Sequence, residues 1–203
     1  MLERGGQSNW AKNFTLEEGA FEWYNKPTVK HRIFIAKPGR KGPIPVNEAE
    51  ISRYITETCE GVDVVVDSGN SFFFYNPDSN VPPDHRFPFV TLVASDLYDQ
   101  FSNLNRSSVF RLNIGIGKQT FRSLFGDPAR SSGRDSAEIN GENLSDYDFT
   151  ALDQVMPHPV YGRMYWVCVL NPGEETFETK VRQLLAEAYD LAVSKYKRQA
   201  ARR

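Results

Sequence analysis

A set of polar and aromatic residues in this sequence has the chemistry of a small-molecule site. An arginine can hold an anion, a tryptophan can stack on a flat ligand, and a histidine can gain or lose a proton near neutral pH. Two of the residues alternate with apolar ones in segment 109–116, and four fall within 158–166. The candidate ligand-binding residues are Arg111, Asn113, His158, Tyr161, Arg163 and Trp166.

A second interpretation of the same residues is purely structural. His158 lies between Pro157 and Pro159 and can cap a turn there. Trp166 can belong to the core, and Arg163 can pair with one of the many surface carboxylates. The sequence leaves both interpretations open.

No complete catalytic or cofactor motif accompanies this set. The segment 115–118 (Gly-Ile-Gly-Lys) lacks the Gly-x4-Gly-Lys-[Ser/Thr] spacing of a phosphate-binding loop, so it favours a strand-to-helix turn. Cys59 and Cys168 are far apart and the chain has three histidines, so we expect neither a metal nor a cofactor. Cys168 stands between two valines, which is typical of a buried reduced thiol and not of a nucleophile paired with His158.

Length and composition predict one folded domain with an extension. The chain has 203 residues, of which 40% are hydrophobic and 13% aromatic. It contains no apolar run of the roughly 18 residues that a membrane span requires. Its N-terminus lacks the apolar region of a secretory signal. We therefore expect no membrane, and the compartment that the sequence predicts is the reducing cytoplasm.

Charge is distributed unevenly along the chain. Residues 1–46 carry eight basic and four acidic side chains, and residues 47–194 carry 11 basic and 22 acidic ones. Residues 195–203 carry five basic side chains and no acid. The acidic middle segment repels phosphate backbones, which argues against nucleic acid as a partner. Only the two basic ends could hold DNA or RNA, and such ends are more often solubilising termini.

The first predicted helix follows an N-terminal extension. Residues 1–46 are expected to be this extension, with a Pro/Gly-rich linker at 37–45 and one short edge strand at 33–35. Asn47 followed by Glu50 is a capping-box pattern, which predicts that a helix begins there.

The helix is expected to bury one face and to end before Gly61. Its predicted inward residues are Ile51, Tyr54, Ile55 and Thr58. The strands predicted after it are 62–67, 71–75, 87–94, 109–116 and 165–170. Apolar and polar residues alternate in 109–116, which indicates a sheet with one face in water.

Two more helices are predicted, a short one over 118–125 and a long one with an apolar stripe over 174–198. Residues 127–147 are polar and rich in Gly and Ser, which predicts a flexible surface loop. The domain then spans 47–198, and residues 199–203 form a basic tail. This order predicts an α+β fold of two layers, with an antiparallel sheet of about five strands and three helices.

Three stretches carry a likeness to known proteins, namely Phe110–Ile114 with the helix after it, Tyr165–Val167 and Leu184–Leu191. They resemble the MmcQ/YjbR-like superfamily, although Tyr165 stands where that group often has a histidine before the tryptophan. Residues 48–197 are still more similar to an uncharacterised single-domain family of actinobacteria and filamentous fungi. The segments that carry this second likeness are 87–92, 95–96, 110–117, 148–152 and 158–162, together with Trp166.

The resemblance implies an α-β(3)-α-β(2)-α fold similar to secretion-chaperone domains. It implies little about activity, because the DNA binding ascribed to the superfamily rests on fold analogy.

The function predicted from all of this is a non-enzymatic binding domain, which takes a small molecule or a protein on the polar-aromatic face of its sheet. One alternative is a small enzyme that acts on an anionic metabolite through His158 and Arg163. Another is nucleic-acid binding through the basic ends. A free sheet edge with an aromatic outer strand would also allow a homodimer.

Overall fold

The structure, a computed structural model, describes residues 46–81, 86–126, 138–139, 142–143 and 147–202. The chain divides into two units, and every helix and strand given below belongs to the unit of Pro43–Asn80 and Pro88–Arg203. Of the other unit, the structure describes Val81, Arg86 and Phe87. The predicted linker 37–45 and edge strand 33–35 lie outside the described residues.

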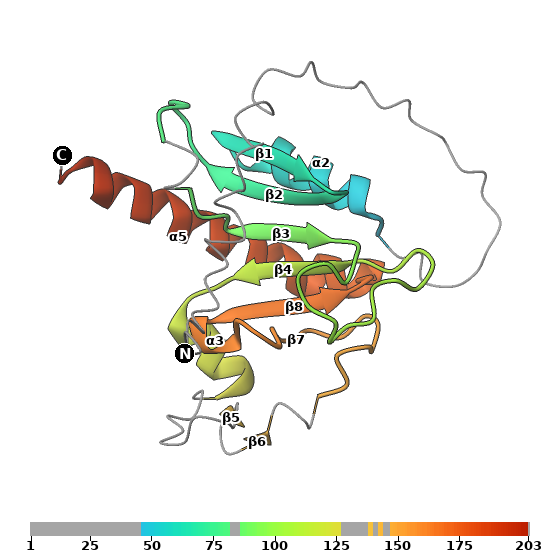
Figure 1. Cartoon of the computed structure of the whole chain (residues 1–203). Coiled ribbons are helices and arrows are strands. Elements are labelled where there is room, and N and C mark those ends of the chain that lie inside the picture. Colours follow the sequence, from blue (N-terminus) through green and yellow to red (C-terminus); the bar gives the residue numbers. More distant parts are fainter. Residues whose placement is uncertain (1–45, 82–85, 127–137, 140–141, 144–146, 203) are drawn as a thin grey trace, which may run out of the picture. The chain divides into compact units, whose positions relative to one another are not determined.

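An antiparallel sheet of six strands forms the centre of the larger unit (Figure 1). The strands lie side by side in the order β1-β2-β3-β4-β8-β7. Their bounds are β1 (Val62–Asp67), β2 (Asn70–Tyr75), β3 (Val90–Val93), β4 (Arg111–Gly115), β7 (Met156–Pro157) and β8 (Trp166–Leu170). The sheet has one strand more than predicted, because two residues such as those of β7 are too few to produce a periodic signal.

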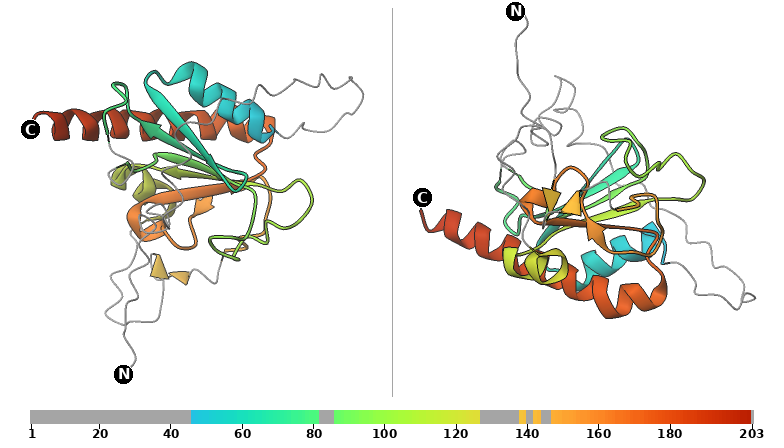
Figure 2. Two further views of the ribbon diagram at one scale, coloured as in Figure 1. Left: turned by 45° about the horizontal axis from the view of Figure 1, so that its top comes forward. Right: turned by 90° about the horizontal axis from the view of Figure 1, so that it is seen from below.

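Three helices cover one face of this sheet (Figure 2). They are α2 (Glu48–Thr58), α3 (Lys118–Phe125) and a long last helix made of α4 (Glu174–Thr176), the π-helical turn η5 (Phe177–Val181) and α5 (Arg182–Ala200). The predicted α+β fold is therefore confirmed. Four strands precede α3, where the resemblance implied three.

The main apolar core lies between the helices and the sheet. Ile51 and Ile55 of α2 and Phe121 of α3 are fully buried in it, against Phe73 and Leu112 of the sheet. Burial of each such side chain contributes about 1.5–3 kcal/mol of stability. The predicted inward position of Thr58 is wrong, because α2 ends at that residue and the next one, Cys59, takes the buried place.

The start of α2 is fixed by the capping box that the sequence predicts. The backbone N–H of Glu50 donates to Oδ1 of Asn47 at 2.9 Å, and the N–H of Asn47 donates to Oε2 of Glu50 at 3.0 Å. Two of the helix's free N-terminal donors are thereby satisfied. After the helix, Gly61 has a φ of +69° and turns the chain into β1, beside Pro77.

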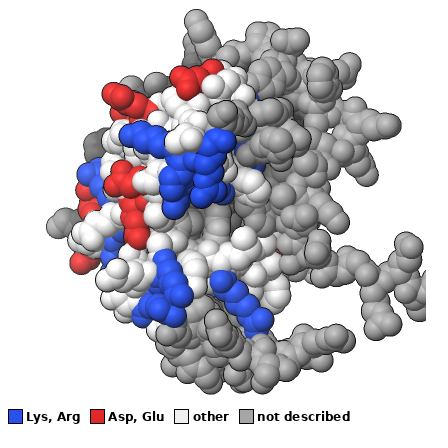
Figure 3. Space-filling view, turned by 90° about the vertical axis from the view of Figure 1, so that its left-hand side faces the viewer, with Lys and Arg blue, Asp and Glu red and all other residues white. Residues whose placement is uncertain are grey.

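The last turn of α5 carries basic side chains. Figure 3 looks onto this end of the molecule and shows groups of Lys and Arg side chains with acidic ones among them. The last turn of the helix contributes Lys197 and Arg198, and the helix includes the first two residues of the predicted basic tail. Among the described residues, no helix is both long and apolar enough to cross a membrane.

Most of the predicted loop 127–147 lies outside the described residues. Its described part contains two short strands, β5 (Glu138–Ile139) and β6 (Glu142–Asn143), which pair antiparallel with each other.

Candidate functional site

The sheet face opposite the helices is buried as well. Arg111 and Asn113 of β4 are 1% and 3% exposed, so the prediction of a wet face is wrong. Segments without regular structure, around Leu104 and Phe149, lie over this face and add a second apolar cluster. Its buried members are Val93, Leu104, Val109, Phe149, Met156, Cys168 and Leu170. Such a cover has no helical or strand period, and periodicity is the signal on which the sequence prediction depends.

Arg111 forms a buried ion pair under this cover. Its Nη1 donates to Oδ1 of Asp99 at 2.9 Å and its Nη2 donates to Oδ2 at 2.6 Å. Nη1 also donates to the hydroxyl of Ser102 at 2.9 Å. The two parallel bonds are the bidentate geometry in which arginine binds a carboxylate most strongly. Arg111 therefore already holds an anion, and that anion belongs to the protein itself.

The segment that supplies Asp99 is held in place by its own polar groups. The carboxylate of Asp96 accepts a hydrogen bond from the backbone N–H of Leu104 at 2.7 Å, which joins the two ends of the segment 96–104 that contains Asp99. The Arg106 guanidinium donates to the carbonyl of Ser102 at 3.1 Å and to that of Thr150 at 3.0 Å. These bonds tie the two covering segments to each other over the buried ion pair.

His158 is buried beside Arg111 and works as a turn cap. Its Nδ1 accepts the backbone N–H groups of Val160 and Tyr161, both at 3.1 Å. Nδ1 therefore carries no proton, and in the neutral ring the proton lies on Nε2. Burial, with the charge of Arg111 as a second cause, holds the pKa of His158 well below its usual value of 6.5. At neutral pH this histidine is an uncharged acceptor that shapes the turn.

Asn113 and Cys168 continue the buried polar row on neighbouring strands. The amide of Asn113 donates to the hydroxyl of Thr91 on β3 at 2.9 Å. Cys168 is paired with Asn113 in the register of β4 and β8, and its thiol donates to the carbonyl of Pro157 at 3.7 Å. Burial raises the pKa of Cys168 to about 12. The cysteine is thus a buried free thiol, as predicted.

The remaining predicted site residues lie closer to solvent. Arg163 is exposed on η4 (Gly162–Met164), and Tyr161 directly precedes that turn with its ring 4.8 Å from the ring of His158. Trp166 begins β8 and lies over Gly115, where a Cβ would be 3.0 Å from the indole. Of the six predicted residues, the structure brings Arg111, His158 and Tyr161 within electrostatic range of one another. Their role in ligand binding stays a prediction.

Two buried polar atoms of this cluster form no hydrogen bond with the described groups. Nε of Arg111 and Oδ1 of Asn113 are buried without a hydrogen-bond partner among the groups that the structure describes. An unmade hydrogen bond on a buried group costs about 1–3 kcal/mol, so each such atom needs an explanation.

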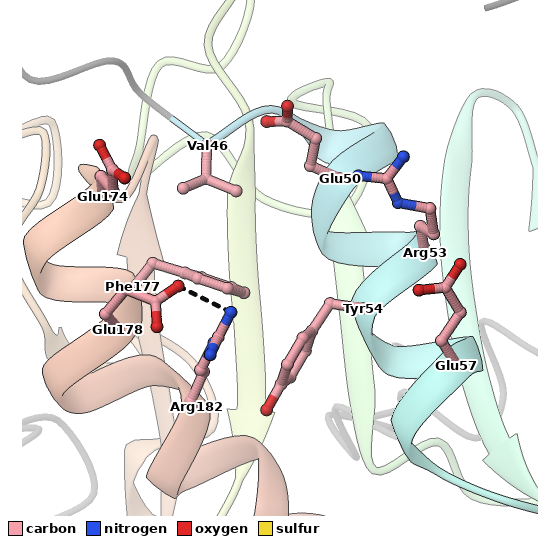
Figure 4. A pocket seen from close by; sticks show the side chains of 9 residues that line it. All are labelled: Val46, Glu50, Arg53, Tyr54, Glu57, Glu174, Phe177, Glu178 and Arg182. Carbon is pink, nitrogen blue, oxygen red and sulfur yellow. Dashed lines mark ion pairs between the residues drawn. The ribbon is translucent and has the colours of Figure 1, made fainter.

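A groove that the sequence prediction missed lies in the helical layer. It has a volume of about 420 Å³ and opens between α2 and the start of the last helix (Figure 4). Its lining residues are Val46, Glu50, Arg53, Tyr54, Glu57, Glu174, Phe177, Glu178 and Arg182. Four glutamates thus face two arginines around three apolar or aromatic side chains.

An aromatic pair and an arginine form the inner part of the groove. The rings of Tyr54 and Phe177 meet edge to face, with centroids 5.4 Å apart. The Arg182 guanidinium lies 4.8 Å from the Tyr54 centroid and 5.6 Å from that of Phe177. It also pairs with the carboxylate of Glu178 at 2.7 Å, the contact drawn in Figure 4. The groove therefore holds a cation between aromatic rings and a carboxylate.

Local backbone features place these residues. Phe177 and Glu178 stand in the π turn η5, and such turns occur frequently at functional sites. The N–H of Val46 donates to the carbonyl of Pro172 at 3.1 Å, which ties the start of α2 to the start of the last helix. The sequence contains the capping box but no mark of the π turn, because Phe177 and Val181 are spaced as in an ordinary α-helix. The groove was therefore not predictable from periodicity.

Comparisons with known proteins give a family and nothing more specific. Neither a curated protein nor a solved structure matches this chain. A family described as a family of unknown function (DUF6194) matches residues 46–201, a range that contains every helix and strand given above. The chain therefore belongs to the DUF6194 family.

Proposed function

We propose that this domain is a non-enzymatic protein-binding domain, and that its groove between α2 and the last helix takes a lysine or arginine side chain of the bound protein. The observation that carries the proposal is the position of Arg182 over Tyr54 and Phe177, beside Glu178. Aromatic faces and carboxylates attract cations, and the groove already stabilises one in this way.

The charge of the groove favours a second cation over an anion. Glu178 is paired with Arg182, which leaves Glu50, Glu57 and Glu174 against Arg53 on the rim. Figure 4 shows Glu174 and Glu57 on opposite sides of the opening. A basic side chain that enters between them would meet carboxylates on both sides. Complementary charge of this kind also speeds the encounter with a basic partner.

The experiment measures binding of a fluorescein-labelled Gly-Arg-Gly-Arg-Gly peptide by fluorescence polarisation at low and at physiological salt. Glu57→Gln with Glu174→Gln removes two groove charges without changing side-chain size. Because exposed charge pairs contribute about 0.2–1 kcal/mol each, we expect this double variant to bind roughly fivefold more weakly.

The matched control is Glu60→Gln with Glu175→Gln. These exposed glutamates stand beside the same helical turns and do not line the groove. The control removes the same charge at positions one to three residues away from the two groove glutamates, so it distinguishes an effect of the groove from an effect of the domain's net charge. Equal weakening in both double variants would contradict the proposal.

The buried polar cluster on the other sheet face supports a second candidate, a small-molecule binding domain. Its specific observation is the pair of unpartnered atoms, a donor on Arg111 and an acceptor on Asn113. A ligand with one acceptor and one donor could satisfy both. Native mass spectrometry of the gently purified full chain tests this candidate. A retained mass that Trp166→Ala or Arg163→Ala removes would support it, and a clean apo mass would count against it.

A further inference from the structure

The place beside the two aromatic rings of the groove is already filled by a cation of the chain itself (Figure 4). The Arg182 guanidinium lies 4.8 Å from the Tyr54 ring centroid and 5.6 Å from that of Phe177, both within the range of cation–π attraction. One of its nitrogens is 2.7 Å from Oε1 of Glu178. These rings and this carboxylate are the groups that would hold a partner's cation, so that cation and Arg182 compete for one place.

Among the described residues, the contacts that hold Arg182 there are surface contacts. The side chains of Arg182 and Glu178 are 43% and 45% exposed, and the two residues are four positions apart on the helix. Ion pairs of this kind and arginine–ring contacts at exposed sites each contribute little. The buried Arg111 gives the contrast, since it is 2% exposed and donates two parallel bonds to Asp99. Arg111 is locked in place, whereas Arg182 can move into solvent at small cost.

The rings of Tyr54 and Phe177 do not depend on Arg182 for their position. Phe177 is 4% exposed and belongs to the main core, and Tyr54 packs against that core. The two rings also contact each other, with centroids 5.4 Å apart. A cation that replaces Arg182 therefore meets rings that are already in place, and its binding needs little further ordering.

We propose that the side chain bound by the groove is an arginine, and that it displaces Arg182 from the two rings and from Glu178. This inference rests on the proposed function and specifies its ligand. The place now accommodates a guanidinium, whose planar fork stacks on aromatic rings and pairs with a carboxylate. A lysine ammonium is a compact and strongly hydrated charge, which uses the same contacts less well. Arg182 is then an internal substitute for the ligand, and it sets the affinity that a partner needs to enter.

The first measurement compares two variants that remove the same charge from the groove. Arg182→Gln vacates the place beside the rings, whereas Arg53→Gln removes a rim charge and leaves Arg182 where it is. Binding of fluorescein-labelled Gly-Arg-Gly-Arg-Gly is followed by fluorescence polarisation at physiological salt, which screens general charge effects. The apparent affinity of a site falls in proportion to the fraction of molecules in which the site is open.

We expect Arg182→Gln to bind this peptide roughly fivefold more tightly than the unmodified chain, because the internal competitor is gone. Arg53→Gln should change the affinity by less than about twofold, since an exposed rim charge contributes little. Circular dichroism of both variants checks that the fold is kept.

The second measurement compares two ligands of equal charge. Gly-Lys-Gly-Lys-Gly carries the charges of the arginine peptide without its guanidinium groups. We expect the unmodified chain to bind the arginine peptide at least about threefold more tightly than the lysine peptide. The same preference should persist in Arg182→Gln, because the rings and the carboxylate of Glu178 remain.

The third measurement observes Arg182 in the unmodified chain, so it does not depend on the stability of a variant. In an isotopically labelled chain, the Nε–H signal of Arg182 is assigned by NMR through its own backbone amide. The neighbouring Tyr54 ring shifts this signal by its ring current. Addition of the unlabelled arginine peptide should therefore move the signal to the position of a solvent-exposed arginine.

Two outcomes would overturn the displacement of Arg182 while the proposed function stands. One is equal affinity of Arg182→Gln and Arg53→Gln for the arginine peptide, and the other is an unchanged Arg182 signal at saturation. Equal binding of the lysine and arginine peptides would overturn the choice of arginine. In these cases the weaker binding of Glu57→Gln with Glu174→Gln would still support the groove as a cation site. No binding to either the unmodified chain or Arg182→Gln would overturn both proposals.

Discussion

The two faces of the central sheet are buried by different means. Behind the sheet, three helices enclose a core in which the buried side chains are apolar, such as Leu112 and Ile114 of β4. On the other face, irregular segments enclose the alternate residues of the same strand, Arg111 and Asn113. One strand therefore contributes to an apolar core on one side and to a buried polar cluster on the other.

The comparison shows that an alternating strand does not by itself identify a face in water. The polar residues of β4 satisfy most of their hydrogen bonds within the protein, through Asp99, Ser102 and Thr91. Buried polar groups are tolerated when they are paired in this way. The face covered by the helices (the helical face) is stabilised by burial of apolar area. The face covered by the irregular segments around Leu104 and Phe149 (the loop-covered face) is stabilised by specific hydrogen bonds and by the buried ion pair. Substitutions should therefore behave differently on the two faces.

The largest effect is expected from breaking the buried ion pair. Arg111→Met leaves the carboxylate of Asp99 buried without its partner, and loss of one partner of a buried pair costs about 3–5 kcal/mol. Leu112→Ala on the helical face should cost a similar amount, about 2–5 kcal/mol, by leaving a cavity. Urea denaturation followed by far-UV circular dichroism measures both free energies of unfolding.

A second substitution separates the two mechanisms. Asp99→Leu added to Arg111→Met replaces the pair by apolar side chains and should recover most of the lost stability, because well-packed apolar residues often replace a buried pair without cost. The same Asp99→Leu added to Leu112→Ala should not recover it. If Arg111→Met alone is neutral, the ion pair does not stabilise this face and the comparison fails.

Most of the fold was predictable because its elements carry local signals. The capping box predicted the start of α2, and the β-branched run 62–67 predicted β1 with its observed bounds. The apolar stripe over 174–198 predicted the last helix. Strand β7 and the cover of the loop face were not predictable, since neither has a period. The α+β architecture is thus fixed by short-range patterns, while the burial of Arg111 depends on irregular segments around Leu104 and Phe149 that have no periodic signal.

A pH-dependent effect is expected from His158 on the loop-covered face. Its pKa is lowered in the folded chain by burial first and by Arg111 second, while the unfolded chain titrates near 6.5. As the pH falls below about 6.5, the unfolded state binds a proton that the folded state does not. Stability is therefore fully present above this pH and should fall by up to about 1.4 kcal/mol for each pH unit below it.

Urea titrations between pH 7.5 and pH 5.5 measure this dependence. The matched variant is His158→Asn, whose side-chain oxygen can accept the same backbone N–H groups but does not titrate. Its stability should change less over this range than that of the unmodified chain. Identical slopes in the two proteins would show that His158 is not the group responsible.

A smaller effect is expected at the start of α2, on the helical face. Asn47→Ala removes the acceptor for the N–H of Glu50, and loss of such a cap costs about 1 kcal/mol. Asn47→Asp keeps an acceptor there and should retain the stability. Urea denaturation of the two variants decides the point, and equal loss in both would contradict a capping role.

The candidate site was only partly predictable, for reasons that differ between its two parts. The sequence singled out Arg111, Asn113 and His158 by residue type, but type does not tell whether an arginine faces a ligand or an internal Asp99. The groove depends on a π turn and on the approach of Tyr54 to Phe177, which lie 123 positions apart in the sequence. Such a contact is set by the packing of two helices and leaves no local pattern.

The smallest effect is expected in the reactivity of the two cysteines toward thiol reagents. One cysteine lies on each face of the sheet, Cys59 on the helical face and Cys168 on the loop-covered face. Cys168 on the loop-covered face is fully buried and its pKa is raised by burial to about 12, so the native chain contains almost no Cys168 thiolate. Cys59, at the end of α2, is 7% exposed and its pKa is also raised by burial. A native chain treated with 5,5′-dithiobis(2-nitrobenzoate) should therefore release colour slowly, first from Cys59.

Cys59→Ser isolates the slower thiol. In that variant, reaction at Cys168 requires an opening of the domain, so its rate should stay far below the rate for the same chain unfolded in urea. Arg111→Met should accelerate it, because loss of the ion pair loosens the segments that cover Cys168. Fast reaction of Cys168 in the otherwise unmodified chain would mean that the loop-covered face opens readily, and the two faces would then differ in dynamics as well as in chemistry.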